Sequence, residues 1–260
     1  MAETPEPRPR FRSVIPMHRC LVTTEKLLRD QCRLEKEEAR HLQTVLRVQA
    51  GEVIELFDGR GKTRQAAVRA LDRHAITLEA IQPVQAARPH RTAITLFACI
   101  SKGKRMDWTI EKAVELGAEQ IIPVISEHTI VRVAADEREE KARRWQKIAD
   151  EAGRQCGTAW VPQIALPLTL EETLPLIKAS APVFLGALTP GVKPLREEIG
   201  KWANPPARAG WYIGPEGDFT AEEIDTLVAA GALPVNLGPL VLRTETACMY
   251  GLAVMNCLFL

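Results

Sequence analysis

The chain has 260 residues, of which 46% are hydrophobic and 26% charged, a composition typical of folded proteins that excludes fibrous and disordered architectures. The formal net charge is +1, but residues 1–91 carry 17 Lys and Arg against 12 Asp and Glu, whereas the remainder carries 17 against 21. A basic first part joined to a mildly acidic second part is compatible with a nucleic-acid-binding module attached to a catalytic one.

Several protein classes are disfavoured by what the sequence lacks. The apolar stretches are too short, or too interrupted by polar residues, to cross a bilayer, and the first residues lack the apolar core of a secretion signal. The six cysteines form no Cys-x-x-Cys pair, and the five histidines never approach metal-ligand spacing. We therefore predict a cytoplasmic protein with reduced thiols, no membrane helix, no metal site and a disordered extension over residues 1–16.

Short strand patterns dominate the first part of the chain. Strands are expected over residues 17–22, 52–57, 63–71 and 75–81, and the glycine turn at 58–61 predicts a hairpin. One helix is expected over residues 35–46, where the apolar residues share one face. The sum is a small, helix-containing β-barrel over residues 17–82, followed by a proline-containing linker over residues 83–92.

Strands and helices alternate after the linker, which indicates an α/β domain with a mainly parallel sheet over residues 93–260. The apolar run at 93–100 predicts a strand buried on both faces, and further strands are expected over 121–125, 183–188, 209–213 and 234–237. Helices are expected over 105–116, 136–153 and 246–260. The helix at 246–260 has apolar residues on nearly all of its faces, which predicts that the rest of the fold and a second subunit bury it.

Three glycine turns follow predicted strands, at residues 185–191, 213–220 and 238–240. The second leads into a helix with a capping box formed by Thr220 and Glu223. Turns of this kind lie at the carboxyl edge of a parallel sheet, and their glycines allow a ligand to approach the backbone closely. Together they suit an adenosine-like ligand, although the spacing of each turn by itself fits an ordinary turn equally well.

Other nucleotide and hydrolase motifs are absent. The segment 101–104 lacks the frame of a P-loop, and the sequence holds neither Gly-x-Gly-x-x-Gly nor Gly-x-Ser-x-Gly, which disfavours nucleotide hydrolysis, dinucleotide redox chemistry and serine-hydrolase chemistry. Basic residues could contact phosphates, although a solvated charged face is the default interpretation of each one. They are Arg19, Arg47, Arg60, Lys62, Arg64, Lys102, Lys104 and Arg105.

Seven motifs occur in order along the chain: SKG at 101–103 with IEKAVELG at 110–117, P at 123, SE at 126–127, WQKIA at 145–149, QCG at 155–157, IGPEG at 213–217, and LGP at 237–239 with LRTETA at 242–247. Together they resemble the RsmE-type ribosomal RNA methyltransferases of the SPOUT superfamily, and the resemblance covers about residues 17–258.

The resemblance implies an α/β protein with a PUA-like N-terminal β-barrel that binds RNA and a SPOUT-type C-terminal domain whose chain end is threaded into a trefoil knot. It implies a homodimer that binds S-adenosylmethionine in the knot and methylates N3 of a specific uridine in 16S ribosomal RNA of the small subunit. Carried over by position, the cofactor-binding residues would be Leu185, Gly186, Gly214, Pro215, Glu216, Gly217, Leu237, Gly238, Leu242, Arg243 and Thr246.

Catalytic roles follow as hypotheses from the chemistry of methyl transfer. Arg243 would stabilise the uridine O2 or O4 as negative charge develops, and Glu216 or Glu245 would orient the base or accept its proton. RNA phosphates would be contacted by Arg19, Arg47, Lys102, Lys104 and Arg105.

The sequence departs from the family pattern at four positions. Asp218 stands where the family usually has Gly, and Leu240 where Arg is common. Arg154 replaces Glu and Thr158 replaces Arg, so only packing or RNA contact is expected at these two positions.

Two alternative functions remain open. One is a related SPOUT enzyme that modifies another RNA site or a ribose 2′-oxygen, which the position of the methyl group in digested RNA would distinguish. The other is a non-catalytic RNA-binding or ribosome-assembly protein, which an absence of cofactor binding would support.

Overall fold

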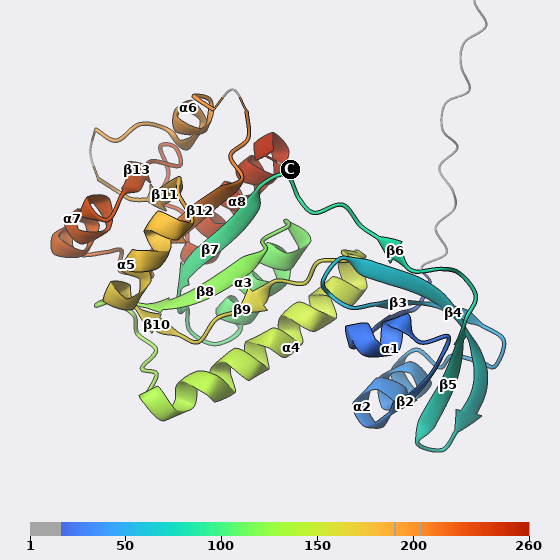
Figure 1. The fold of residues 1–260 in the computed structure, drawn as a ribbon. Coiled ribbons are helices and arrows are strands. Elements are labelled where there is room, and N and C mark those ends of the chain that lie inside the picture. The colour runs from blue at the N-terminus through green and yellow to red at the C-terminus, as the bar shows by residue number, and fades with distance from the viewer. Residues whose placement is uncertain (1–16, 190, 203, 260) are drawn as a thin grey trace, which may run out of the picture. The chain divides into compact units, whose positions relative to one another are not determined.

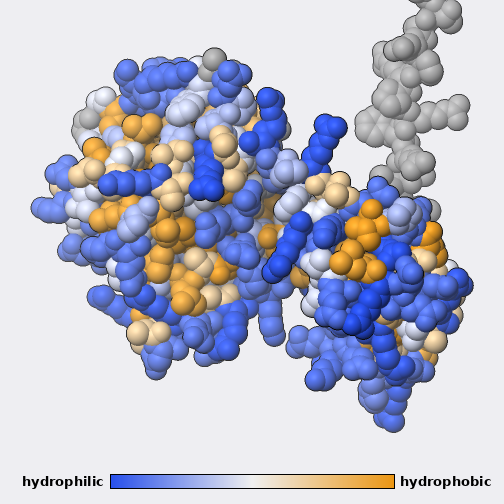
Figure 2. Space-filling view, viewed as in Figure 1, coloured by the Kyte–Doolittle hydropathy of each residue, from blue (hydrophilic) through white to orange (hydrophobic). Residues whose placement is uncertain are grey.

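The computed structural model describes residues 17–189, 191–202 and 204–259, so the predicted extension over residues 1–16 lies outside the described residues. The described residues divide into two compact units, 17–58 with 62–86, and 59–61 with 87–259. Hydrophilic side chains cover much of the face of each unit seen in Figure 2, between smaller apolar patches. In the described part of the chain, no helix is long and apolar enough to cross a membrane.

A curled sheet with the strand order β1-β3-β4-β5-β2 forms the first unit (Figure 1). Its pairs are antiparallel, except that β1 runs parallel to β3, and β6 pairs with the start of β4. The strands are β1 (Arg19–Leu21), β2 (Gln31–Glu35), β3 (Val53–Phe57), β4 (Lys62–Asp72), β5 (Ala75–Ala80) and β6 (Gln85–Ala86). The predicted hairpin at 58–61 connects β3 to β4, as expected.

The helical part of the first unit differs from its prediction. The helix expected over residues 35–46 starts one residue later, because Glu35 still belongs to β2. It consists of an α-helix, α2 (Lys36–Arg40), that continues as a π-helix (His41–Val45). The short helix α1 (Thr24–Leu28) and strand β2 were not predicted. Helix α1 is too short to show a period, and its signal is the capping Thr23, whose hydroxyl accepts a hydrogen bond from the Lys26 N–H at 3.3 Å.

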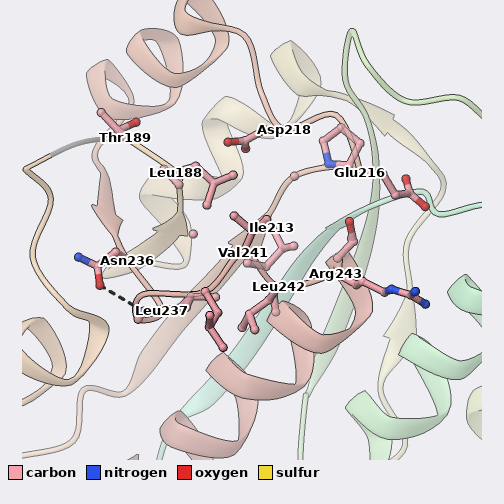
Figure 3. A pocket seen from close by; sticks show the side chains of 18 of the residues that line it. Leu188, Thr189, Ile213, Glu216, Asp218, Asn236, Leu237, Val241, Leu242 and Arg243 are labelled. Carbon is pink, nitrogen blue, oxygen red and sulfur yellow. Dashed lines mark hydrogen bonds between the residues drawn. The ribbon is translucent and has the colours of Figure 1, made fainter.

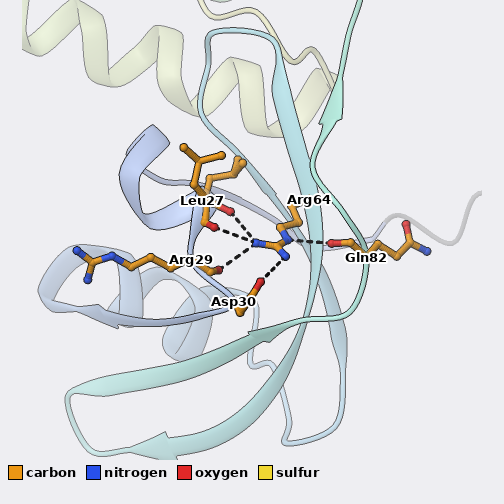
Figure 4. Close-up of polar contacts among 6 residues, drawn as sticks. Leu27, Arg29, Asp30, Arg64 and Gln82 are labelled. Carbon is orange, nitrogen blue, oxygen red and sulfur yellow. Dashed lines mark hydrogen bonds and ion pairs between the residues drawn. The ribbon is translucent and has the colours of Figure 1, made fainter.

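Arg64 has a structural role that the sequence did not reveal (Figure 4). Its guanidinium donates hydrogen bonds to the carbonyls of Arg29 at 3.1 Å and Gln82 at 2.8 Å, and it pairs with the Asp30 carboxylate at 2.7 Å. The side chain is only 11% exposed. These bonds satisfy backbone carbonyls at the end of α1, so Arg64 holds this unit together, and the phosphate contact considered for it is not supported.

The second unit contains a parallel sheet with the strand order β10-β8-β7-β12-β11-β13, to which β9 is added beside β8. Helices cover both of its faces (Figure 1). The strands are β7 (Ala93–Cys99), β8 (Gln120–Ile125), β9 (Gln163–Ile164), β10 (Leu168–Thr169), β11 (Val183–Gly186), β12 (Arg208–Ile213) and β13 (Ala232–Val235). The helices are α3 (Lys104–Glu115), the 3-10 helix Ala135–Glu137, α4 (Arg138–Cys156), α5 (Leu170–Ala179), α6 (Leu195–Ile199), α7 (Ala221–Ala229) and α8 (Thr244–Phe259).

The expected alternation of strands and helices is confirmed, and most bounds agree within two residues. The strand expected at 234–237 lies two residues earlier, because Asn236 has already left the sheet to bond to the loop after β11. The elements β9, β10, α5 and α6 were not predicted. The two-residue strands and the five-residue helix α6 carry no recognisable period, whereas α5 has a local signal, the capping box of Thr169 and Glu172, that the prediction missed.

Both faces of the sheet are buried, as the apolar run of β7 predicts. Alternate residues of β7 and β12 contribute to different cores: Leu96 and Trp211 pack toward α3, α4 and α8, whereas Phe97 and Tyr212 pack toward α5 and α7. The Phe97 and Tyr212 rings stack with their centroids 5.0 Å apart. The Tyr212 hydroxyl is satisfied by the hydroxyl of Thr173 at 3.0 Å. These two cores fix the strand ends that carry the glycine turns.

Candidate functional site

The carboxyl ends of β11, β12 and β13 surround a cavity of about 480 Å³ (Figure 3). Its walls are the loops that follow these strands, at 186–191, 213–218 and 236–244, together with Ala247 at the start of α8. The three strands are parallel, and β11 lies between the other two, so their loops share one edge. We call this space the three-loop cavity. Its volume lies within the range of small-molecule sites.

The loop after β12 makes a tight turn before α7. The Asp218 N–H donates to the Pro215 carbonyl at 3.0 Å, and Asp218 has a left-handed backbone with φ of +57°. Gly214 could not carry a side chain without displacing Phe219, since a Cβ there would lie 3.0 Å from its ring. The predicted capping box is present, with the Thr220 hydroxyl accepting from the Glu223 N–H at 3.1 Å. Local packing therefore fixes this wall.

Asn236 connects the other two loops of the cavity. Its side-chain amide donates to the Val192 carbonyl at 2.7 Å, its backbone N–H donates to the Lys193 carbonyl at 3.0 Å, and its side-chain oxygen accepts from the Gly238 N–H at 3.3 Å. The resemblance places the threaded chain end in this region. No local pattern points to this residue, because two of its three partners, Val192 and Lys193, lie more than forty positions upstream.

Replacing Asn236 with alanine should loosen both loops at once. The change removes two side-chain hydrogen bonds, which together contribute about 1–2 kcal/mol, and leaves the Val192 carbonyl without its donor. We expect the free energy of unfolding in urea to fall by that amount and the affinity of the cavity for its ligand to fall about tenfold. Asn256→Ala, which removes a single hydrogen bond to the Leu116 carbonyl remote from the cavity, serves as the control. Equal ligand affinities in the two variants would contradict the connecting role.

Most of the predicted cofactor-binding residues line the three-loop cavity. They are Gly186, Gly214, Pro215, Glu216, Leu237, Gly238, Leu242 and Arg243. The other three lie outside its lining. Leu185 is fully buried in the core. Gly217 faces His128, since a Cβ on this glycine would lie 3.1 Å from the Cβ of His128. Thr246 is exposed on α8. The lining also includes Asn236, which belonged to no predicted turn or motif, and further residues of the predicted loops that were not individually assigned to the cofactor: Ala187, Leu188, Thr189, Ile213, Val241, Thr244 and Ala247.

The three predicted catalytic residues are in different surroundings. Arg243 lines the cavity directly before α8, and its carbonyl accepts the Ala247 N–H at 2.8 Å. Glu216 also lines it, but its carboxylate is paired with Arg105 at 3.0 Å. Glu245 does not contribute to the lining, and its Oε2 is buried without a hydrogen-bond partner in the described structure. The geometry therefore favours Arg243 and Glu216 over Glu245.

The predicted RNA-binding residues also differ in their availability. Arg19 has a side chain only 10% exposed, which pairs with Glu55 and lies with its guanidinium 4.2 Å from the centroid of the Phe57 ring. That packing argues against a phosphate contact. Arg47 is exposed, with a left-handed φ of +53°. The other three residues are exposed at the start of α3, just after β7: Lys102, Lys104 and Arg105.

Burial and backbone hydrogen bonds shift the pKa of three side chains close to the site. Burial raises the pKa of the Cys99 thiol to about 12 and also raises that of Cys248, so both are protonated near neutral pH. The Asp218 and Gly217 carbonyls contact Nδ1 of His128 at 2.9 and 3.1 Å, and these hydrogen bonds raise the pKa of the imidazole. Among the residues that the structure describes, no group of three His, Cys, Asp or Glu side chains could hold a metal ion.

Comparison with known families identifies the chain. Residues 88–256 match the RNA methyltransferase domain family, and residues 34–81 match the RNA methyltransferase PUA domain family. The chain belongs to the RNA methyltransferase family. This methyltransferase is 30% identical to the Ribosomal RNA small subunit methyltransferase E of Synechocystis over 95% of its own length and 79% of the relative.

Solved structures agree with this assignment. Ribosomal RNA small subunit methyltransferase E from Neisseria gonorrhoeae, bound to S-adenosylmethionine, is 32% identical with a TM-score of 0.83. A Legionella pneumophila protein with the same cofactor is 30% identical with a TM-score of 0.84. Each match covers 94% of this chain and 98% of the other. The predicted fold class, a SPOUT-type α/β domain preceded by a PUA-like domain, is confirmed.

Proposed function

We propose that this methyltransferase uses S-adenosylmethionine to methylate N3 of a specific uridine in 16S ribosomal RNA, as a homodimer that acts on the small ribosomal subunit. The observation that carries the proposal is the three-loop cavity, whose lining includes eight of the eleven residues that the family resemblance assigns to the cofactor. Two relatives at 30% and 32% identity are solved with S-adenosylmethionine bound. Curated relatives from several bacteria are small-subunit ribosomal RNA methyltransferases by name.

The residues of the cavity suit an adenosine-containing ligand. Apolar side chains, including Ile213 and Leu242, offer surface to an aromatic base. Leu240 and Val241 at its rim are 75% and 78% exposed, which is unfavourable in water and would be relieved by a ligand that covers them. The strand ends and glycine turns supply backbone N–H and C=O groups for the polar edges of a nucleoside.

S-adenosylmethionine supplies the methyl group from a sulfonium, and transfer to uridine N3 releases the N3 proton and leaves neutral S-adenosylhomocysteine. The protein has to align the acceptor nitrogen with the methyl carbon and exclude water, and positioning of this kind contributes roughly 7–11 kcal/mol to catalysis. Arg243 would stabilise the negative charge that develops on the uridine oxygens as the N3 proton leaves. Glu216, held by Arg105 at the rim, would orient the base or accept that proton.

RNA would approach over the exposed basic residues at the start of α3. Lys102, Lys104 and Arg105 follow β7, whose neighbour β12 carries one wall of the cavity. Because Arg105 already pairs with Glu216, a phosphate that draws Arg105 away would release the carboxylate at the moment when substrate arrives.

The decisive test pairs cofactor binding with mapping of the product. Isothermal titration should show one S-adenosylmethionine bound per chain, and incubation with small subunits that lack the modification should yield 3-methyluridine in digested 16S RNA. Ala247→Trp, which fills the cavity from the first turn of α8, should abolish both results, whereas Ala229→Trp, at an exposed position of α7 outside the cavity lining, should preserve cofactor binding. A ribose 2′-O-methyl product would support the related-enzyme alternative. Failure to bind the cofactor would favour an RNA-binding protein without activity.

A further inference from the structure

The Asp218 side chain folds back over the turn that it belongs to and lines the three-loop cavity. Its Oδ1 accepts a hydrogen bond from the Phe219 N–H at 2.9 Å and lies 3.3 Å from the position that a Cβ on Gly214 would take. The residue has φ of +57°, a conformation that aspartate and asparagine tolerate better than most residues. The turn therefore holds a carboxylate at the wall of the cavity.

Unlike the Glu216 carboxylate, the Asp218 carboxylate forms no ion pair with a basic side chain in the described residues. Glu216 pairs with Arg105 at 3.0 Å, whereas the hydrogen bond that Asp218 accepts comes from an uncharged backbone N–H. Within the described ranges, no Lys, Arg or His side chain forms an ion pair with Asp218. Figure 3 shows Arg243 extending toward the Glu216 side of the cavity, away from Asp218.

We propose that Asp218 makes the three-loop cavity selective for a cationic ligand over its neutral counterpart, and thereby favours S-adenosylmethionine over S-adenosylhomocysteine. The inference rests on the proposed function, because methyl transfer breaks the methyl carbon–sulfur bond and leaves the bonding pair on sulfur, which converts a sulfonium into a neutral thioether. The attraction of Asp218 for that positive charge is present before transfer and absent after it. The residue therefore favours replacement of the bound product by a new molecule of S-adenosylmethionine.

The expected size of the effect follows from Coulomb's law in a partly solvated cavity. Opposite unit charges several ångströms apart, in surroundings with an effective dielectric constant between about 20 and that of water, attract strongly enough to change a dissociation constant about tenfold. The interaction acts through space and does not require direct contact. It should weaken as added salt screens the charges.

The test compares both ligands on three proteins by isothermal titration. Asp218→Asn removes the charge but keeps the side-chain oxygen that accepts from Phe219 and the tolerance for a left-handed backbone. Asp225→Asn, on the exposed face of α7, makes the same change in net charge outside the cavity. We expect Asp218→Asn to weaken S-adenosylmethionine binding about tenfold and S-adenosylhomocysteine binding less than twofold, and Asp225→Asn to change neither.

A measurement on the unmodified protein keeps the test independent of the variant's folding. Raising the salt concentration from about 0.05 to 0.5 M should weaken binding of S-adenosylmethionine more than that of S-adenosylhomocysteine. The selectivity role would be overturned if Asp218→Asn weakened the binding of both ligands equally. It would also be overturned if the ratio of the two dissociation constants stayed the same in the variant and across the salt series. Either result would leave the proposed function intact. If the unmodified protein binds neither ligand, the proposed function fails and the inference fails with it.

Discussion

Replacing Gly251 with alanine is expected to destabilise the second unit by about 3 kcal/mol. A Cβ on Gly251 would lie 2.1 Å from Cε2 of Trp211, a contact that no side chain can make. Trp211 cannot move aside, because it is fully buried in the core and its indole N–H donates to the Ala247 carbonyl at 3.2 Å. Either α8 moves away from the sheet or the tryptophan leaves its place. Urea denaturation followed by tryptophan fluorescence measures the loss.

The sign of this result separates packing from helix propensity. In a helix without tertiary constraints, glycine to alanine stabilises by about 1 kcal/mol, so propensity and packing predict opposite outcomes. Cys257→Ala on the exposed side of α8 serves as the control and should change the free energy of unfolding by less than about 0.5 kcal/mol. A Gly251→Ala protein as stable as the parent would show that α8 does not pack on Trp211 as described.

The elements that the sequence predicts well are those whose local pattern agrees with their burial. The run at 93–100 is apolar at every position except Thr95, and the structure buries its two faces in separate cores. The capping box of Thr220 and Glu223 is equally local, since all its donors and acceptors lie within four residues. Such patterns predict the structure correctly because they depend only on residues that are close in the sequence.

The features that escaped prediction depend on contacts between distant parts of the chain. A basic residue on a strand has the same appearance whether it faces solvent or, like Arg64, satisfies carbonyls more than thirty positions away. The same holds for Arg19, whose partner Glu55 is brought near by the parallel pairing of β1 and β3. The π-helix after α2 escaped prediction for a different, local reason: its backbone hydrogen bonds span five residues instead of four, a difference that hydrophobic periodicity does not resolve.

The candidate site was predictable in outline but not in its connections. Glycine turns after successive strands indicated which loops would meet, because parallel strands present their carboxyl ends at one edge. The sequence could not show that Asn236 joins two of these loops, or that Gly217 turns away from the cavity toward His128. Whether a loop residue faces a ligand depends on backbone angles and neighbours that the linear spacing leaves undetermined.

Removing the guanidinium of Arg243 should slow methyl transfer far more than it weakens cofactor binding. Arg243 lines the cavity, and its backbone is fixed by the first turn of α8, so Arg243→Ala should leave the wall in place. In the described part of the chain, no carboxylate forms an ion pair with Arg243, whereas Arg105 is engaged with Glu216. Loss of a group that stabilises developing charge costs about 10²–10³-fold in kcat.

Single-turnover transfer of a labelled methyl group to small subunits measures this loss, with the dissociation constant of S-adenosylmethionine determined in parallel. Arg196→Ala, an exposed position on α6 outside the cavity, should retain full turnover. Arg243→Lys should recover only part of the activity, because an ammonium restores the charge but not the planar pair of donors. Full turnover with unchanged cofactor affinity in Arg243→Ala would exclude a catalytic role, whereas a loss confined to cofactor affinity would make Arg243 a binding residue. The assignment therefore depends on kcat, the quantity that reports charge stabilised only in the transition state.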